Sequence, residues 1–314
     1  APIAGAFFAL EVVIGYYAFS AFAPVVMASV VGTIVARVHL GDFSAFVINA
    51  HLFPRVAGVR PSGLVSATAA VFFMRGILFT QMAWARTNVQ GWLRPALAGA
   101  AIGAIAIVLP EILGVGYEAT NQALNEAMPL WLLFALLAAK IAATCPSLGS
   151  GFVGGVFSPS LFIGAMTGGA FGFVAASIVP ELSSSQSVYA IAGMGAVAGA
   201  VLGAPISTIL IVFELTSNYE VTVVVMVAVT VAAVATGQFG HRSFFHLQLR
   251  GSGLDLQEGR EVGLMREVRV SHVMTREFIC LASTAGIGET KRILSVEPDA
   301  DIVVVDDDGW QLGM

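Results

Sequence analysis

Long apolar stretches, separated by short segments rich in turn residues and charges, make up most of the first 240 residues. Several of them are shorter than the ~20 residues that a helix needs to cross a bilayer. This pattern predicts an all-α polytopic membrane protein in which full spans are mixed with tilted, half-spanning and re-entrant helices. The predicted helical stretches cover residues 2–14, 21–38, 63–85, 95–109, 130–144, 157–179, 188–201, 204–215 and 221–239.

Charged residues become frequent only after Gly240. Twenty of the 35 Asp, Glu, Lys and Arg side chains lie in residues 241–314. We therefore predict a transmembrane domain over residues 1–250, a linker over 251–267 and a water-soluble domain over 268–314. A short helix at 287–295 and a buried strand from Ile302 indicate an α/β unit in the last of these. Because the chain opens inside an apolar stretch, we expect it to be a fragment of a longer protein.

The overall composition agrees with a membrane protein. Apolar residues make up 57% of the 314 positions and charged residues only 11%, against about 25% in soluble domains. The net charge of −5 argues against a nucleic-acid partner and leaves the lipid bilayer as the expected surroundings. Cys145 and Cys280 lie in different predicted domains, so we expect neither a disulfide framework nor a metal site.

A short motif occurs twice in the membrane domain, 203 residues apart. Ala1-Pro-Ile and Ala204-Pro-Ile are each followed, nine residues after the proline, by a lone glutamate, Glu11 or Glu214. Transport domains are often built from duplicated, inverted repeats, which this spacing indicates. Acids within a membrane can carry protons. Both glutamates, however, lie at the ends of short helices, and we expect them to cap or bond across the repeat interface.

A glycine-rich segment, Leu148–Pro159, lies within a stretch that has no charged residue between Lys140 and Glu181. Irregular backbone at membrane depth is tolerated only where it is buried in protein or lines a wet cavity. A helix that begins there offers unpaired N–H groups and the positive end of its dipole. The segment therefore predicts an anion site at a helix start near Val156, with Pro159 in the first turn, where its missing N–H costs nothing.

Two further features flank this segment. Lys140 is the single lysine of the predicted membrane domain, and it either raises the local potential for anions or extends toward an interface. Glycines at four-residue spacing predict helices that pack closely: Gly164, Gly168 and Gly172, followed by Gly195, Gly199 and Gly203.

Three motifs occur in order along residues 1–250: the two Ala-Pro-Ile…Glu repeats, Gly154–Pro159 with the pattern GxFxP, and Phe213–Tyr219 before the last long helix. Together they resemble the CLC family of chloride channels and anion/proton exchangers. The resemblance implies an inverted-repeat fold with broken and re-entrant helices, which forms a homodimer with one anion pathway per subunit. It also implies chloride as the transported ion, no cofactor and no enzymatic activity.

The resemblance implies roles for individual residues of the glycine-rich segment. The backbone N–H groups of Val156 and Phe157 would coordinate a dehydrated anion, and Gly154 and Gly155 would let the loop approach it closely. Two further pore segments, one with a serine and one with a gating glutamate, are expected on the N-terminal side of Ala1.

The sequence departs from the family pattern at two positions. Family members commonly place a tyrosine hydroxyl on the anion from the final helix, where this chain has Phe245, or Phe244 if the alignment shifts by one. Proton-coupled members often carry a second acid after the repeat glutamate as an internal proton relay, and this chain has Val12 there. Because an apolar side chain cannot carry a proton, Val12 favours a channel.

The C-terminal region from about Val268 resembles the first part of a cystathionine-β-synthase-type (CBS) domain. A complete pair of such domains could bind an adenine nucleotide. Basic residues at the membrane exit, among them Arg242 and His246, are typical of a cytoplasmic flank. We therefore expect a protein of the cell (inner) membrane with a cytoplasmic C-terminal region.

Three functions follow from these observations. The first is a chloride channel of the voltage-gated type, whose pore is lined by backbone N–H groups at a helix start. The second is a chloride/proton antiporter of the same fold. The third is a nucleotide-sensing role of the CBS-like region.

Overall fold

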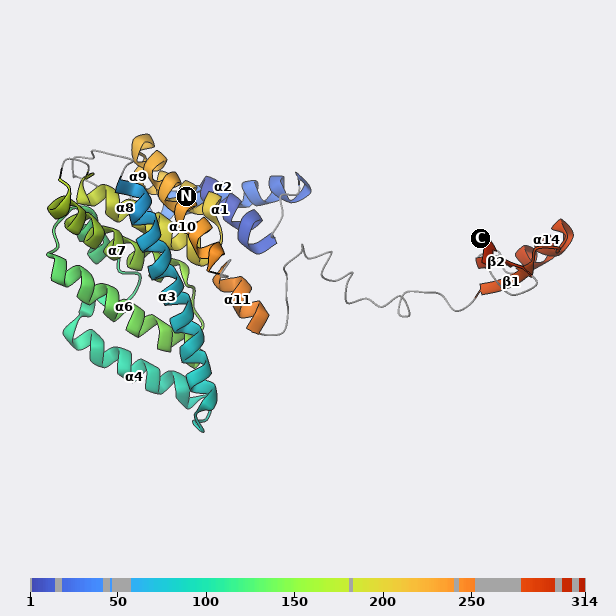
Figure 1. The fold of residues 1–314 in the computed structure, drawn as a ribbon, viewed down its shortest axis with the longest axis horizontal. Coiled ribbons are helices and arrows are strands. Elements are labelled where there is room, and N and C mark those ends of the chain that lie inside the picture. Colours follow the sequence, from blue (N-terminus) through green and yellow to red (C-terminus); the bar gives the residue numbers. More distant parts are fainter. Residues whose placement is uncertain are drawn as a thin grey trace. The chain divides into compact units, whose positions relative to one another are not determined.

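A computed structural model of the chain describes residues 2–14, 19–41, 46, 58–180, 183–239, 243–251, 278–296, 301–306 and 311–313. The chain divides into two compact units, Ala1–Asp255 and Leu256–Met314 (Figure 1). The division lies inside the segment for which the sequence predicts a linker, residues 251–267.

The regular secondary structure in the described part of the first unit is all helical, as the apolar pattern predicts. Its helices are α1 (Pro2–Phe8), which continues as a π-helical turn η1 (Ala9–Ile14), α2 (Phe19–Leu40), α3 (Val59–Arg86), α4 (Leu93–Val108), the 3₁₀ turn η3 (Pro110–Ile112), α5 (Tyr117–Leu124), α6 (Leu130–Ser150), α7 (Phe157–Ile178), α8 (Gln186–Leu202), α9 (Pro205–Thr216), α10 (Tyr219–Gln238) and α11 (Phe244–Gly251). Among the described helices, α2, α3, α6, α7 and α10 are long and apolar enough to cross a membrane.

Helix α6 differs from the prediction at its C-terminal end. The apolar pattern predicts its end at residue 144, but the helix continues through Pro146 to Ser150. It ends at Gly151, which adopts a left-handed conformation with φ +101° and donates its N–H to the Leu148 carbonyl. Proline inside a membrane helix is tolerated where neighbouring groups satisfy the freed backbone. The irregular loop is therefore shorter than the glycine-rich segment predicts and begins at Gly151.

Helix α5 is absent from the sequence prediction. Its sequence, Tyr117–Leu124, alternates polar and small apolar residues and does not form an apolar run. Ala119 and Ala123 are nevertheless buried, because they face the core formed with α6 and α7. Leu124 is buried in a second cluster with residues of α7 and α8. Short helices of this kind are specified by tertiary packing more than by their own hydropathy.

Helices α7 and α8 pack backbone against backbone. A Cβ atom added at Gly168 would lie 2.0 Å from the Tyr189 carbonyl oxygen, and one added at Gly193 would lie 2.4 Å from the Gly164 carbonyl oxygen. Helices associate in a bilayer without a hydrophobic driving force, so close contact between small residues replaces it. The packing role predicted for the glycine ladders is confirmed here, although Gly203 itself ends α8 in a left-handed turn with φ +68°.

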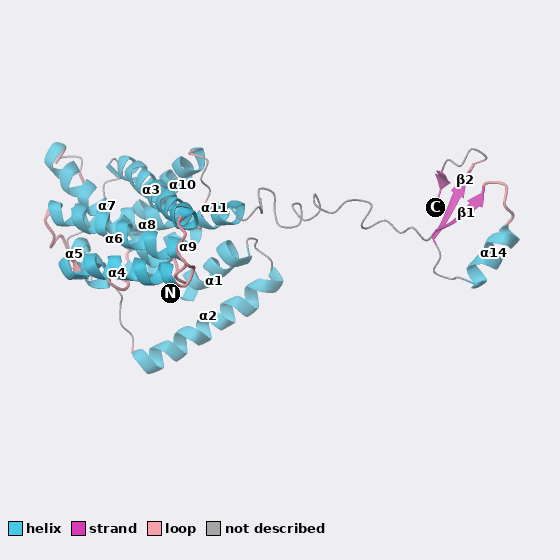
Figure 2. Ribbon diagram, turned by 90° about the horizontal axis from the view of Figure 1, so that it is seen from below, coloured by secondary structure: helices cyan, strands magenta, loops and turns pink. Residues whose placement is uncertain are grey.

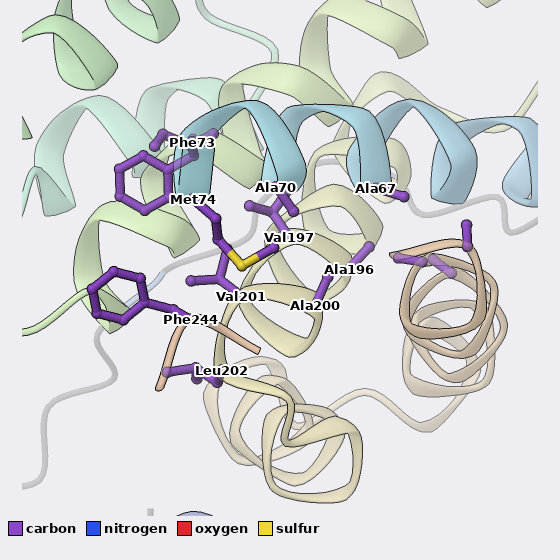
Figure 3. Packing of buried hydrophobic residues seen from close by; sticks show 14 of the residues in the cluster. Ala67, Ala70, Phe73, Met74, Ala196, Val197, Ala200, Val201, Leu202 and Phe244 are labelled. Carbon is purple, nitrogen blue, oxygen red and sulfur yellow. The ribbon is translucent and has the colours of Figure 1, made fainter. Parts of the chain in front are cut away.

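Helix α3 packs against α8 through a core of small and medium apolar side chains. Figure 3 shows Phe73 and Met74 of α3 beside Val201 of α8, with Phe244 of α11 directed into the same cluster. Phe244 is 6% exposed, so its ring belongs to this core. The cluster also contains Val156, the residue directly before α7.

The two Ala-Pro-Ile motifs lie at the starts of α1 and α9, and each glutamate bonds to the other repeat. Glu11 accepts hydrogen bonds from the backbone N–H groups of Ile206 and Ser207, at 3.3 and 2.8 Å, and from the Ser207 hydroxyl. Glu214 accepts from the N–H groups of Ile3 and Ala4, at 2.9 and 3.2 Å.

Both glutamates thus bond across the repeat interface, and their capping role stays a prediction. Each carboxylate satisfies otherwise unpaired donors in the first turn of a helix and complements its dipole. Because the C-terminal end of each helix bonds to the N-terminal end of the other, α1 and α9 must run antiparallel. Two equivalent motifs in antiparallel orientation are what an inverted repeat requires.

Helix α2 leaves most of its surface uncovered by the rest of the described chain. Figure 2 shows α2 at the edge of the first unit next to α1, where the Ser29 hydroxyl donates to the Pro2 carbonyl at 2.6 Å. None of the residues from Phe22 to His39 is buried. Large apolar side chains such as Met27, Ile34 and Val38 are 64, 56 and 76% exposed. His39 lies in the last turn of this helix and contacts the Val35 carbonyl through Nδ1.

The second unit contains β1 (Phe278–Ala282), α14 (Ile287–Val296), β2 (Asp301–Val305) and β3 (Gln311–Gly313). Strands β1 and β2 are parallel and joined by α14, and β3 pairs antiparallel with β2. The predicted helix and strand are confirmed, although the β2 side chains from Ile302 onward are half-buried, not buried as predicted. Residues 268–275, whose sequence resembles the start of a CBS domain, lie outside the described residues.

The reciprocal caps lead to a stability prediction. Glu11→Ala or Glu214→Ala is expected to lower the free energy of unfolding by about 1–2 kcal/mol, because each removes the acceptor for a helix start. Glu111→Ala removes the same charged group from an exposed position of η3 and is expected to change stability by less than about 0.5 kcal/mol. Denaturant unfolding of the complete protein in detergent measures all three; equal losses for all three would contradict the capping role.

The α7–α8 contact leads to a second prediction. Gly168→Ala is expected to destabilise the protein by about 1–3 kcal/mol, because its methyl group would overlap the Tyr189 carbonyl. Gly103→Ala in α4 meets no atom within 4 Å and is expected to be neutral or stabilising by up to about 1 kcal/mol. Thermal unfolding of the two variants compares them directly, and a Gly168→Ala protein as stable as Gly103→Ala would show that the two helices are not in close contact.

Candidate anion-binding site

The site predicted from the glycine-rich segment lies where the irregular loop meets α7. Residues 152–155 have no regular secondary structure and are exposed, Val156 stands at the N-cap position, and α7 begins at Phe157. No side chain caps this helix start. Within the described part of the chain, the backbone N–H groups of Val156, Phe157 and Ser158 donate to no protein acceptor. The N-terminus of a membrane-spanning helix therefore presents open donors at its positive end.

The side chains of Val156 and Phe157 anchor this turn to the helical core. Val156 is 2% exposed and packs in the cluster shared by α3 and α8. The half-buried Phe157 ring lies with its centroid 6.3 Å from that of Phe8 in α1. With both side chains held by the core, the backbone between them is fixed and its N–H groups are presented from a rigid support.

The first turn of α7 forms in spite of Pro159. The Ser160 N–H donates to the Val156 carbonyl at 3.1 Å, and the Ser160 hydroxyl donates to the Phe157 carbonyl at 2.6 Å. Proline in the first helical turn lacks an N–H that would have no partner within the helix. Pro159 therefore sits where the sequence predicts it.

A second loop supports α7 from the side. The Ser158 hydroxyl donates to the Val115 carbonyl at 3.3 Å, and Val115 belongs to the connection between η3 and α5. The sequence does not single out Ser158 or this connection. The glycines at 114 and 116 indicate a tight turn in this connection, but the sequence does not show which helix the turn contacts.

Lys140 lies beneath the same connection. It is 4% exposed, and its Nζ donates to the Ile112 and Gly114 carbonyls at 2.7 and 2.9 Å. Its ammonium group also lies 4.9 Å from the centre of the Phe162 ring of α7. Of the two roles that the sequence leaves open, extension toward an interface is wrong, because the carbonyl groups of the turn hold the side chain inside the helical unit.

Gly154 and Gly155 lie in open surroundings. A Cβ atom added at Gly155 would meet none of the described residues within 4 Å, and one added at Gly154 would meet only the Leu148 side chain, at 3.6 Å. Neither glycine has the positive φ that would require it. Neither the packing nor the backbone conformation of the described residues therefore requires a glycine at these positions, and close approach to an anion stays a prediction for both.

Phe245 and Phe244 differ in their surroundings. Phe244 is part of the core, whereas Phe245 is 38% exposed and forms an edge contact with the Phe244 ring at 5.8 Å. Of the two aligned positions, only Phe245 therefore has a ring face available to a pathway. Val12 is half-buried against the same core cluster.

The chain belongs to the voltage-gated chloride channel family, the CLC family, whose profile matches residues 1–237. A relative from Ralstonia nicotianae, named a putative chloride channel protein ClcB-like, is 37% identical over 246 residues that cover 76% of this chain and 57% of the relative. The H(+)/Cl(−) exchange transporter ClcA of Vibrio cholerae is 28% identical over 82% of this chain and 58% of its own length. This chain is thus an integral membrane protein that spans less than two thirds of these relatives.

Solved structures share the fold. A slow cyanobacterial Cl−/H+ antiporter superposes with a TM-score of 0.67 at 24% identity, covering 80% of this chain and 61% of the antiporter. A eukaryotic CLC transporter superposes with a TM-score of 0.63 at 20% identity, covering all of this chain and 55% of that protein. The predicted inverted-repeat membrane fold is confirmed by these superpositions.

Proposed function

We propose that the complete protein transports chloride across a membrane and binds it through the backbone N–H groups of Val156 and Phe157. The observation that carries this proposal is the uncapped start of α7, whose donors meet no acceptor among the described residues. Membership of the CLC family and the names of the relatives support chloride as the ion. An uncapped helix start is in any case a natural anion site.

Neutral donors suit a site through which ions pass. The sequence has no basic residue from 141 to 180, so the charge that attracts the anion comes from the helix dipole and backbone donors. Conduction requires binding strong enough for the anion to enter and weak enough for it to leave. A basic side chain in direct contact would shift this balance toward retention.

We assign Phe245 to the opposite wall of the same site. A phenyl ring offers only its weakly positive edge to an anion, whereas a tyrosine would add a hydroxyl donor. The pathway therefore has one hydrogen-bond donor fewer than in family members with tyrosine, and we expect it to discriminate less between small anions. Gly154 and Gly155 leave room for an anion or for another part of the protein beside the loop.

We favour a passive channel over an exchanger. Val12, at the position where exchangers often carry an acid, cannot accept a proton, and its surroundings in the core are apolar. The Ralstonia relative is named a putative channel. A chloride/proton antiporter is the second candidate, because the Vibrio relative and one similar structure bear that description.

We propose further that the protein is a homodimer of the cell (inner) membrane with its C-terminal unit in the cytoplasm. The exposed apolar side chains of α2, among them Met27, Ile34 and Val38, suit contact with a second copy of the chain in the bilayer. The parallel β1–α14–β2 arrangement suits the first part of a CBS-type domain.

Reconstitution of the complete protein in liposomes distinguishes channel from exchanger. With a chloride gradient across the membrane and no proton gradient, a channel is expected to set a membrane potential at the chloride equilibrium value and to move no protons. Voltage-sensitive and pH-sensitive dyes report both quantities, and empty liposomes are the control. Uphill proton movement driven by the chloride gradient would contradict the channel; absence of any chloride flux would contradict the proposed function.

The anion-binding turn is tested by removing one N–H group. Val156→Pro deletes one coordinating donor and is expected to weaken chloride binding about tenfold or more, because hydrogen bonds to charged groups contribute about 1.5–3 kcal/mol. Val156→Ala shortens the same buried side chain but keeps the N–H, and its chloride affinity is expected to stay within about twofold of wild type. Isothermal calorimetry with chloride measures both, and equal affinities for the two variants would refute the assignment.

A further inference from the structure

Residues 112–115, the end of η3 and the connection that follows it, direct three carbonyl groups at neighbouring helices. Those of Ile112 and Gly114 accept from Lys140 of α6, and that of Val115 accepts from Ser158 of α7. Lys140 and Ser158 therefore hold the same short turn from two helices. One of those helices provides the anion-binding turn.

The geometry of the turn depends on its glycines. Gly114 and Gly116 adopt left-handed conformations, with φ +60° and +78°, which other residues rarely adopt. A Cβ atom at Gly116 would also lie 2.5 Å from the Phe162 ring, so glycine lets the turn rest directly on α7. The turn thus contacts α7 at Ser158 and, one helical turn later, at Phe162.

The burial of Lys140 is costly without its contacts to this turn. A charged side chain inside a membrane protein is stable only when it is paired or hydrogen-bonded. No carboxylate contacts Lys140 within the described part of the chain; its partners are the two carbonyl groups and the Phe162 ring. Removing the ammonium group would leave the Ile112 carbonyl without this donor and free the turn to rearrange.

We propose that Lys140 is a positioning residue for the anion-binding turn. It fixes the carbonyl groups of Ile112 and Gly114, so that the Val115 carbonyl stays in place for Ser158 and the N–H groups of Val156 and Phe157 keep their direction. Lys140 does this without touching the anion. This inference rests on the proposed function of the α7 start as a chloride site.

The test uses the complete protein and chloride as the probe. Lys140→Met keeps the length of the aliphatic side chain but removes its donors, and it is expected to weaken chloride binding about tenfold. Lys140→Arg restores donors to the same carbonyl groups and is expected to bind chloride within about threefold of wild type. Asn218→Ala removes the side-chain cap of α10 and serves as a stability control: its melting temperature falls, while its chloride affinity stays unchanged.

A double-mutant cycle separates positioning from a general loss of stability. Because Lys140 and Ser158 act through one turn, the double variant Lys140→Met/Ser158→Ala is expected to bind chloride about as weakly as Lys140→Met alone. Effects that multiply would mean that the two residues act independently and would overturn the proposal. Unchanged chloride affinity in Lys140→Met, with a lowered melting temperature, would overturn it as well.

Hydrogen exchange tests the tether independently of chloride transport. Lys140→Met is expected to speed amide exchange in residues 160–162, the first hydrogen-bonded amides of α7, whereas Asn218→Ala leaves them unchanged. Unaltered exchange there would refute the positioning role even if the wild-type protein transports chloride. Wild-type protein that binds no chloride, with exchange altered as expected, would instead refute the proposed function and leave the tether standing.

Discussion

Backbone hydrogen bonding in a medium without water governs this fold, since every N–H and C=O group must find a partner in the protein or at a wet site. Three helix starts show how the chain meets this demand. Glu214 and Glu11 bring carboxylates to the first turns of α1 and α9 from the opposite repeat. The start of α7 receives no such group among the described residues. Two helix starts thus receive carboxylates of the protein, and the third has no such partner among the described residues, which is the basis of the proposed anion site.

The unpaired N–H groups at the start of α7 stay available only if the helix cannot shift to pair them with acceptors of the protein. The packing around α7 prevents such a shift. Backbone contact with α8 at Gly168 and Gly193 fixes the helix along its length. Val156 and Phe157 anchor its first residues in the core. The turn held by Lys140 supports it from the side. Donors fixed in this way need no reorganisation when an anion arrives.

The inverted repeat explains why elements far apart in sequence meet at one place. The antiparallel contact of α1 with α9 brings Phe8 to Phe157 and Val12 to the core that contains Val156. A position early in the chain therefore borders the region of the α7 start. Val12 lies 144 residues before Val156 in the sequence but packs against the same core, which is why our proposal of a channel considers both residues together.

Hydropathy predicted a helical membrane protein and most of its long helices, because residues that face lipid must be apolar. Motif spacing predicted the duplicated segment and the location of the α7 start, because glycine and proline positions are read directly from the sequence. The bonding role of Glu11 and Glu214 also followed from the repeat. Tertiary structure decided what local pattern cannot express: that α6 continues through Pro146, that the polar α5 is a buried helix, and that Lys140 turns inward. Each of these depends on partners from distant segments, since an interior helix end, a short helix and a buried ammonium group are stable only through the groups that surround them.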